Sequence, residues 1–411
     1  MSLRTYPFQR FLATALGYLV CNALLSAQPA QPPAPGGPAP APHGAAPQPG
    51  PGGPGPGQRL LLGGPGPRPP LTEQEGIPAP QNDAELAAAI RTFADRLAAA
   101  GKFSGTIRVE KSGAPLLAEA WGMADRANGR ANTPETTYDI ASVGKLFTQI
   151  AVLQLLEQGR LKLDDTVGRH LPDYPQADVA AKVTVAHLLK HTSGLGALFD
   201  RITPDTNLAG MMQLRDFLPV FAAQAPRFEP GTGNAYSNAG YVVLGLIIEA
   251  ASGENYYDYI DRHVIQPAGL ERTAFLRRTA LPESAARSYE GGRDVTQMHP
   301  VRGSPAGGLH ASAGDLVRLV GAINAGKLLS REGVRLLATE IYPPNPFSTA
   351  AAAEGRLAAI GFAGGAPGVS AVCTINRDGR YVTSMLANNA GGITEDMWAV
   401  LRGWINGLPP A

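Results

Sequence analysis

The chain has 411 residues, a formal net charge of +1, 44% hydrophobic residues and two cysteines. Its length and apolar content are typical of a globular protein that can bury a large core. The nearly neutral charge gives no electrostatic basis for binding nucleic acid. Cys21 and Cys373 cannot build a disulfide framework, and Cys373 lies in an apolar, strand-like run that predicts a buried thiol.

The first 80 residues form two segments of distinct composition. Residues 1–27 have a basic start and an uncharged apolar run that ends at Ser26-Ala27, which predicts a cleaved signal peptide rather than a membrane anchor. Residues 28–80 are rich in Pro, Gly, Ala and Gln and have too little apolar surface to fold, which predicts a disordered linker. We therefore expect export to the periplasm or the extracellular space, with the linker available for association with the cell envelope.

Residues 81–411 are expected to form one folded domain that contains both helical and strand-like patterns. In chain order we expect a helix over 84–100, two strands within 104–121, a turn at 136–137, a helix over 142–157, a short helix over 183–194, a helical subdomain over 195–230 and a helix over 239–251. Gly101, Gly159 and Gly253 follow three of the helical patterns, and glycine commonly ends a helix.

Ser142 and Lys145 lie three residues apart at the start of one helical pattern. Positions i and i+3 share a helix face, so the hydroxyl and the amine are expected to be neighbours. A serine becomes nucleophilic when a base takes its proton, and a buried lysine with a lowered pKa can be that base. The helix start also favours negative charge that develops near Ser142. This is the sole Ser-x-x-Lys in the chain, and the motif is a signature of serine β-lactamases and penicillin-binding proteins.

A second motif, Tyr236-Ser-Asn238, comes immediately before the apolar helical pattern at 239–251. Its position predicts a loop from which a phenol and an amide can point into a cleft. A phenol beside an amine can carry a proton, and an amide can orient a substrate carbonyl. The two motifs together indicate nucleophilic catalysis.

His187 and His191 are four residues apart, a spacing that can place two metal ligands on one helix face. The neighbouring sequence offers no third ligand, and no H-E-x-x-H motif is present. We interpret the two side chains as hydrogen-bonding groups near a helix end, and we expect neither a metal nor a cofactor.

Together with several shorter runs, these motifs resemble the serine β-lactamase-related hydrolases of the class C type. This family also contains D-alanyl-D-alanine carboxypeptidases, D-aminopeptidases and family VIII esterases. The resemblance covers residues 105–389 and includes Ser104-Gly-Thr-Ile, Ile140-Ala-Ser-Val-Gly-Lys145, Leu163-Asp-Asp165, His187-Leu-Leu-Lys-His-Thr-Ser-Gly194, Phe228-Glu-Pro-Gly231, Tyr236-Ser-Asn238 and Ala306-Gly-Gly-Leu309. It implies an α/β (α+β) fold, in which helices flank an antiparallel sheet and a mostly helical subdomain is inserted. The site is expected between the sheet domain and this subdomain.

The resemblance also implies a role for each motif residue. Ser142 would be the acylated nucleophile, and Lys145 its base partner. Tyr236 would shuttle the proton and activate the deacylating water, while Asn238 would contact the substrate. The backbone N–H groups of Ser142 and Gly365 would form the oxyanion hole.

The third family motif departs from the usual pattern. Members carry Lys or His, then Thr, Ser or Gly, then Gly, on a strand that lines the cleft. Here Phe362 and Ala363 take the first two places and Gly364 is retained. The missing cation would lower the pKa of Lys145 or Tyr236 and would dock a substrate carboxylate. A cleft lined by Phe362 and Gly364 suits a neutral acyl ester better, and family VIII esterases resemble this pattern.

We therefore expect a serine hydrolase that forms an acyl-enzyme on Ser142 and acts on small acyl esters. Two alternatives remain open. One is a D-amino-acid peptidase or β-lactam-directed hydrolase, and the other is a catalytically inactive, penicillin-binding-like binding protein. The expected partner is a small ester or a peptide-like molecule.

Overall fold

The computed structural model describes residues 70–196, 198, 206–389 and 391–409. The predicted signal peptide at 1–27, residues 28–69 of the predicted linker and part of the predicted helical subdomain at 195–230 lie outside the described residues. Within the described part of the chain, no helix is both long and apolar enough to span a membrane.

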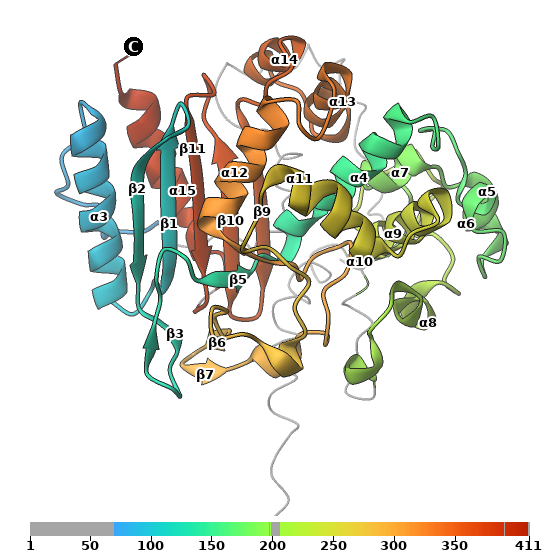
Figure 1. Ribbon diagram of the computed structural model, residues 1–411, viewed down its shortest axis with the longest axis horizontal. Coiled ribbons are helices and arrows are strands. Elements are labelled where there is room, and N and C mark those ends of the chain that lie inside the picture. Colours follow the sequence, from blue (N-terminus) through green and yellow to red (C-terminus); the bar gives the residue numbers. More distant parts are fainter. Residues whose placement is uncertain (1–69, 197, 199–205, 390, 410–411) are drawn as a thin grey trace, which may run out of the picture. The chain divides into compact units, whose positions relative to one another are not determined.

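A five-stranded antiparallel sheet forms the centre of the described fold, with the strand order β2-β1-β11-β10-β9 (Figure 1). Its strands are β1 (Gly105–Lys111), β2 (Ala114–Trp121), β9 (Ile360–Ala366), β10 (Val369–Ile375) and β11 (Tyr381–Ala387). The turn between β1 and β2 has positive φ at Ser112 and Gly113, as a tight hairpin requires. The two strands predicted within 104–121 are confirmed, and β1 pairs with β11 from the far end of the sequence.

Helices cover both faces of the sheet. On one face, α3 (Asp83–Ala99) packs against β2, and α15 (Ile393–Gly407) packs against β10 and β11. The rings of Phe93 and Trp404 meet there edge to face at 5.8 Å, within an apolar cluster that also contacts Leu71 and Ile77. On the other face, α12 (Ala313–Asn324) packs against β1 and β11 (Figure 1).

A helical region adjoins the β9 side of the sheet and surrounds a second apolar cluster that includes Phe147. Its helices are α4 (Lys145–Glu157), α5 (Val167–His170), α6 (Ala177–Lys182), α7 (Val185–Leu189), α8 (Leu218–Phe221), α9 (Asn238–Ser252), α10 (Tyr256–Ile260) and α11 (Gln266–Ala268), and α13 (Arg331–Leu336) and α14 (Pro346–Ala353) follow later in the chain. The helix α4 packs against α9, and α9 packs against α7. The helix predicted over 239–251 is confirmed, and Gly253 ends it with a φ of 73°.

Three pairs of short strands connect these parts, namely β3 (Met123–Asp125) with β4 (Arg130–Ala131), β5 (Thr137–Asp139) with β8 (His310–Ser312), and β6 (Tyr289–Glu290) with β7 (Arg293–Asp294). The turn predicted at 136–137 is wrong at Thr137, which starts β5 and pairs with Ser312. Local sequence gives no signal for a partner so distant in the chain. The short helix predicted over 183–194 is also shorter than expected, because His191 adopts a left-handed φ of 59°.

Candidate active site

Ser142 lies where a 3-10 turn passes into an α-helix. It belongs to η2 (Ala141–Gly144), and Lys145 is the first residue of α4, so the helix predicted from residue 142 begins as a tighter turn. Ala141 has a φ of 48°, a left-handed conformation that is uncommon for a residue with a side chain. The Ala141 N–H donates to the Asp139 carboxylate at 2.7 Å, which holds this bend.

Gly364 of β9 packs directly against the bend. A β-carbon at Gly364 would lie 2.3 Å from the Ile140 carbonyl oxygen and 2.6 Å from the Ser142 nitrogen. A glycine is therefore needed for this strand to approach the start of the helix so closely. Gly364, which was predicted to bind substrate, here contacts the backbone at Ser142 and positions the strand.

Lys145 is buried, with an exposed fraction of 4%, and has three polar neighbours. Its Nζ lies 3.2 Å from Ser142 Oγ, 2.8 Å from Asn238 Oδ1 and 2.5 Å from the Ala306 carbonyl oxygen. Burial holds the pKa of Lys145 well below its ordinary value.

A neutral amine has two N–H donors and one lone pair. The Asn238 and Ala306 oxygens can only accept, so they take the two donors of a neutral Lys145. The lone pair of Lys145 is then left for the Ser142 hydroxyl, which is the arrangement that a general base requires. Asn238, predicted to contact substrate, is thus placed by the structure against Lys145.

Tyr236 lies on the other side of the Ser142 hydroxyl. Its phenol donates to Ser142 Oγ at 3.0 Å, and its ring lies 4.8 Å from the Lys145 Nζ. Burial raises the pKa of Tyr236 to about 12, so the phenol keeps its proton in the ordinary pH range. Ser142 can therefore accept a hydrogen bond from Tyr236 while it donates its own proton to Lys145.

The edge strand β9 brings the third motif to the same place. The two-residue turn Pro367-Gly368 joins β9 to β10, and Gly365 lies opposite Ser370. Pairs in an antiparallel hairpin alternate between those that exchange hydrogen bonds and those that do not, starting with a bonded pair at the turn. Gly365 belongs to a pair of the second kind, so its N–H points to the free edge of β9.

A small cavity of about 40 Å³ opens beside Ser142. Phe362 lines it, with an exposed fraction of 3%, and its ring meets the Tyr342 ring edge to face at 5.4 Å. The remaining lining residues are Lys145, Gln149, Leu189, His191, Tyr236, Tyr241, Ile341, Gly361 and Ala363. Ser142, Lys145, Tyr236 and Phe362 were all predicted for the site, and the fold brings these four together from three separate parts of the chain.

His191 holds the loop that carries Tyr236. Its Nδ1 accepts the Ser237 N–H at 3.1 Å, its carbonyl oxygen accepts the Ala235 N–H at 3.0 Å, and its ring stacks on Tyr236 at 4.6 Å. Burial lowers the pKa of His191 to about 3, so its imidazole is neutral. Sequence reasoning interpreted this residue as a hydrogen-bonding histidine but did not connect it to Tyr236.

The same reasoning missed Gln149 and Tyr342, which line the cavity and belong to no motif. Only their contacts in the fold identify them. His187, four residues before His191, accepts the Thr184 N–H through its Nδ1 as part of a helix cap. Among the described residues, no three His, Cys, Asp or Glu side chains gather in a way that could hold a metal ion.

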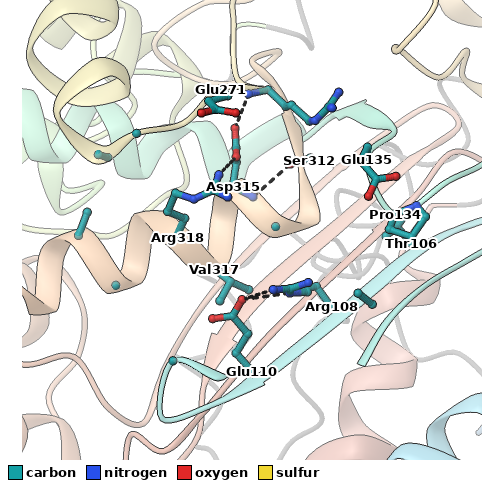
Figure 2. Close-up of a pocket in the computed structure, with 18 of the residues that line it drawn as sticks. Thr106, Arg108, Glu110, Pro134, Glu135, Glu271, Ser312, Asp315, Val317 and Arg318 are labelled. Atoms are coloured by element: carbon teal, nitrogen blue, oxygen red, sulfur yellow. Dashed lines mark hydrogen bonds and ion pairs between the residues drawn. The ribbon is translucent and has the colours of Figure 1, made fainter. Parts of the chain in front are cut away.

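A larger cavity of about 740 Å³ lies elsewhere, between α12 and the β1–β2 hairpin (Figure 2). Charged side chains of both signs line it, and four of them form two ion pairs, Arg108 with Glu110 and Arg318 with Asp315. None of the predicted site residues lines this cavity. The smaller cavity beside Ser142 is therefore the candidate active site.

Known proteins with similar sequences and structures support this fold. The profile of the family described as Beta-lactamase matches residues 88–400. The chain is 35% identical over 236 residues to esterase EstB of Burkholderia gladioli, covering 53% of this chain and 57% of that protein. It is 32% identical over 196 residues to penicillin-binding protein 4* of Bacillus subtilis, covering 47% of this chain and 43% of that protein.

Among solved structures, the penicillin-binding protein of Bacillus halodurans aligns with a TM-score of 0.66 and 28% identity, covering 75% of this chain and 99% of that one. The chain thus spans about half the length of the two curated relatives and nearly all of this solved structure. It belongs to the beta-lactamase family and has the β-lactamase/transpeptidase-like fold. The predicted fold class is confirmed.

Proposed function

We propose that this chain is an exported esterase that hydrolyses small, neutral acyl esters through an acyl-enzyme on Ser142. The observation that carries the substrate class is Phe362, which lines the cavity at the place where family members have a cation. Lys145 is the one ordinarily cationic side chain in that lining, burial disfavours its charge, and His191 is neutral. A substrate carboxylate there would have its charge uncompensated, which costs several kcal/mol, whereas an ester carries no charge.

Acylation follows from the hydrogen bonds at Ser142. Lys145 takes the hydroxyl proton while Ser142 Oγ bonds to the ester carbonyl carbon. The N–H groups of Ser142 and Gly365 stabilise the negative charge on the carbonyl oxygen. When the tetrahedral intermediate collapses, the bond to the alkoxide breaks, Tyr236 gives its proton to the leaving oxygen, and the Lys145 ammonium restores the proton of Tyr236. The products of this half-reaction are a free alcohol and an ester on Ser142.

The similarity to esterase EstB supports this substrate class. The export part of the proposal rests on the sequence of residues 1–27, which lie outside the described residues. The alternatives, a D-amino-acid peptidase or β-lactam hydrolase and an inactive binding protein, differ from an esterase in what becomes attached to Ser142.

Intact-protein mass spectrometry of wild type and Ser142→Ala tests the proposal. Each protein is incubated with p-nitrophenyl acetate, a D-alanyl-D-alanine peptide, a β-lactam and a fluorophosphonate, and turnover of the ester is followed in parallel. We expect the acetyl and phosphonyl adducts on wild type alone, and a loss of ester turnover of at least about 1,000-fold in the variant, because the nucleophile is removed.

A stable adduct with the β-lactam and no ester turnover would favour the first alternative, and the absence of every adduct would favour the inactive binding protein. The mass of the protein recovered from outside the cytoplasm also shows whether cleavage follows Ala27.

A further inference from the structure

Three side chains that line the catalytic cavity, Gln149, Tyr241 and Tyr342, form a hydrogen-bonded chain that the acylation step does not use. The Tyr342 hydroxyl donates to Gln149 Oε1 at 3.2 Å, and Gln149 Nε2 donates to the Tyr241 hydroxyl at 2.7 Å. The Tyr241 hydroxyl in turn donates to the Leu189 carbonyl oxygen at 3.3 Å. Gln149 has an exposed fraction of 2% and lies one helical turn after Lys145 on α4.

The Leu189 carbonyl fixes the direction of this chain, because a carbonyl oxygen can only accept. Tyr241 must therefore use its single proton on Leu189, so it accepts from Gln149. The amide oxygen of Gln149 is then the atom that faces Tyr342, and it takes the Tyr342 proton. The Tyr342 oxygen is left with lone pairs and no proton to give, so any further partner in the cavity has to donate to it.

The cavity is the right size and polarity for such a partner to be water. Its volume of about 40 Å³ has room for one or two water molecules, which need two to four polar partners. Ser142, Lys145 and Tyr342 all line it, so a water there can contact the acyl group, the base and the Tyr342 oxygen.

We propose that Tyr342 positions the water that hydrolyses the acyl-enzyme. The inference rests on the proposed function and assigns the second half of that reaction. The hydroxyl of Tyr342 bonds to Gln149 and makes no hydrogen bond to Ser142 or Lys145, so the acylation step should not depend on it.

In the acyl-enzyme, Ser142 Oγ no longer carries a proton, and the lone pair of Lys145 is free. The water donates one hydrogen to Lys145, and not to Tyr236 as the resemblance implied, because the Tyr236 phenol keeps its own proton. It donates the other hydrogen to the Tyr342 oxygen, so that the lone pair of the water oxygen points at the acyl carbon. As the new C–O bond forms, the first proton passes to Lys145. The bond from the acyl carbon to Ser142 Oγ then breaks, Oγ takes that proton from Lys145, and the carboxylic acid leaves.

The test is the decay of isolated acetyl-enzyme in wild type and Tyr342→Phe. Each protein is acetylated briefly with p-nitrophenyl acetate, the excess ester is removed, and the loss of the adduct is followed by intact mass. The variant keeps the ring that packs on Phe362 and loses only the acceptor oxygen. We expect decay to slow about ten-fold, the effect of losing one hydrogen bond in the transition state, with the acetylation rate unchanged within about two-fold. At steady state, kcat and KM for this ester should fall together, which leaves kcat/KM unchanged.

Tyr259→Phe is the matched control. The Tyr259 hydroxyl also bonds to a glutamine of α4, Gln154, but neither residue lines the cavity, so decay of the acetyl-enzyme should be unchanged. Gln149→Met is a second test variant, because it frees the Tyr342 proton and removes the cause of its acceptor role. We expect it to slow decay as well.

Unchanged decay in Tyr342→Phe would overturn the inference, as would a fall in the acetylation rate equal to the fall in the decay rate. Either result would leave the proposed function intact. If wild type itself formed no acetyl-enzyme, the proposed function would fail, and the inference with it.

Discussion

At the scale of single residues, burial lowers the pKa of Lys145, which is one of the two effects expected of the missing cation of the third motif. Lys145 has three polar contacts, and its burial alone lowers its pKa. Burial acts on Tyr236 in the opposite direction, because the charged form of a phenol is the anion, and raises its pKa to about 12. In the proposed mechanism the two groups therefore have different roles, with Lys145 as the acceptor of the Ser142 proton and Tyr236 as a donor. Phe362 is compatible with this division because neither role needs a neighbouring positive charge.

The pH dependence of ester hydrolysis distinguishes these two candidate bases. A neutral Lys145 is the active form, so kcat/KM should fall about ten-fold per pH unit below the lowered pKa of Lys145 and reach a plateau above it. If the Tyr236 phenolate were the base, the rate would keep rising towards pH 12. Measurement of kcat/KM from about pH 5 to about pH 10 with a stable ester, in wild type and Tyr236→Phe, decides between them.

We expect Tyr236→Phe to be slower than wild type but to keep the same acid limb. A wild-type rate without a plateau in this range would contradict the assignment of the base to Lys145.

At the scale of elements, the site depends on the contact between β9 and η2. At Gly364 the two backbones are so close that the contact has no room for a side chain. Gly365, the next residue of the strand, is exposed, and a β-carbon there would lie no closer than 4.0 Å to its nearest neighbour. The two adjacent glycines therefore have different structural roles. Gly364 allows the close approach of strand and helix start, and Gly365 presents its N–H at the free edge.

Substitution of these two glycines tests that contrast. Gly364→Ala should lower the free energy of unfolding by about 1–3 kcal/mol and reduce kcat at least about ten-fold, because β9 and the Ser142 backbone must separate. Gly365→Ala retains the N–H and has open space, so its stability should stay within about 0.5 kcal/mol of wild type. Chemical denaturation and steady-state kinetics measure both effects, and equal behaviour of the two variants would argue against the proposed contact.

The connection between α7 and α9 shows a second limit of local sequence reasoning. His191 lies two residues after the end of α7, has a left-handed φ, and its side chain accepts a hydrogen bond from the residue after Tyr236. Periodicity predicted the two helices but carries no information on their separation in space, and hence none on a bond between their ends.

At the scale of the whole described fold, the sheet separates two apolar clusters with different relations to the site. The cluster around Phe93 lies between the sheet and the helices α3 and α15, and it contains none of the predicted site residues. The cluster around Phe147 includes Phe362 and surrounds α4, the helix that begins with Lys145. Stability and activity should therefore respond differently to cavities made in the two clusters.

Phe93→Ala and Phe147→Ala are a matched pair, since both side chains have an exposed fraction of 0%. Each substitution should lower the free energy of unfolding by about 3–5 kcal/mol through lost burial and cavity formation. We expect kcat/KM at 25 °C to remain near that of wild type in Phe93→Ala and to fall in Phe147→Ala, where α4 can shift. Equal losses of activity in folded samples of both variants would contradict the separation of the clusters.

The sequence by itself determined the features that depend on short range. Helical periodicity placed Ser142 and Lys145 one turn apart, the turn ahead of residue 239 placed Tyr236, and the hairpin at 104–121 followed from its glycine turn. The replacement of the family cation by Phe362 was also visible in the sequence, and with it the expectation of a neutral substrate.

The tertiary structure alone decided the features that depend on residues far apart in the chain. It showed that Asn238 forms a hydrogen bond with Lys145 and that Gly364 packs against the Ser142 backbone. It also brought Gln149 and Tyr342 together at the cavity. The pairing of β5 with β8 and the burial of Lys145 belong here as well. Burial and long-range contacts arise when separate segments pack together, so the pKa values and proton directions that the proposed chemistry requires are properties of the fold and not of any single motif.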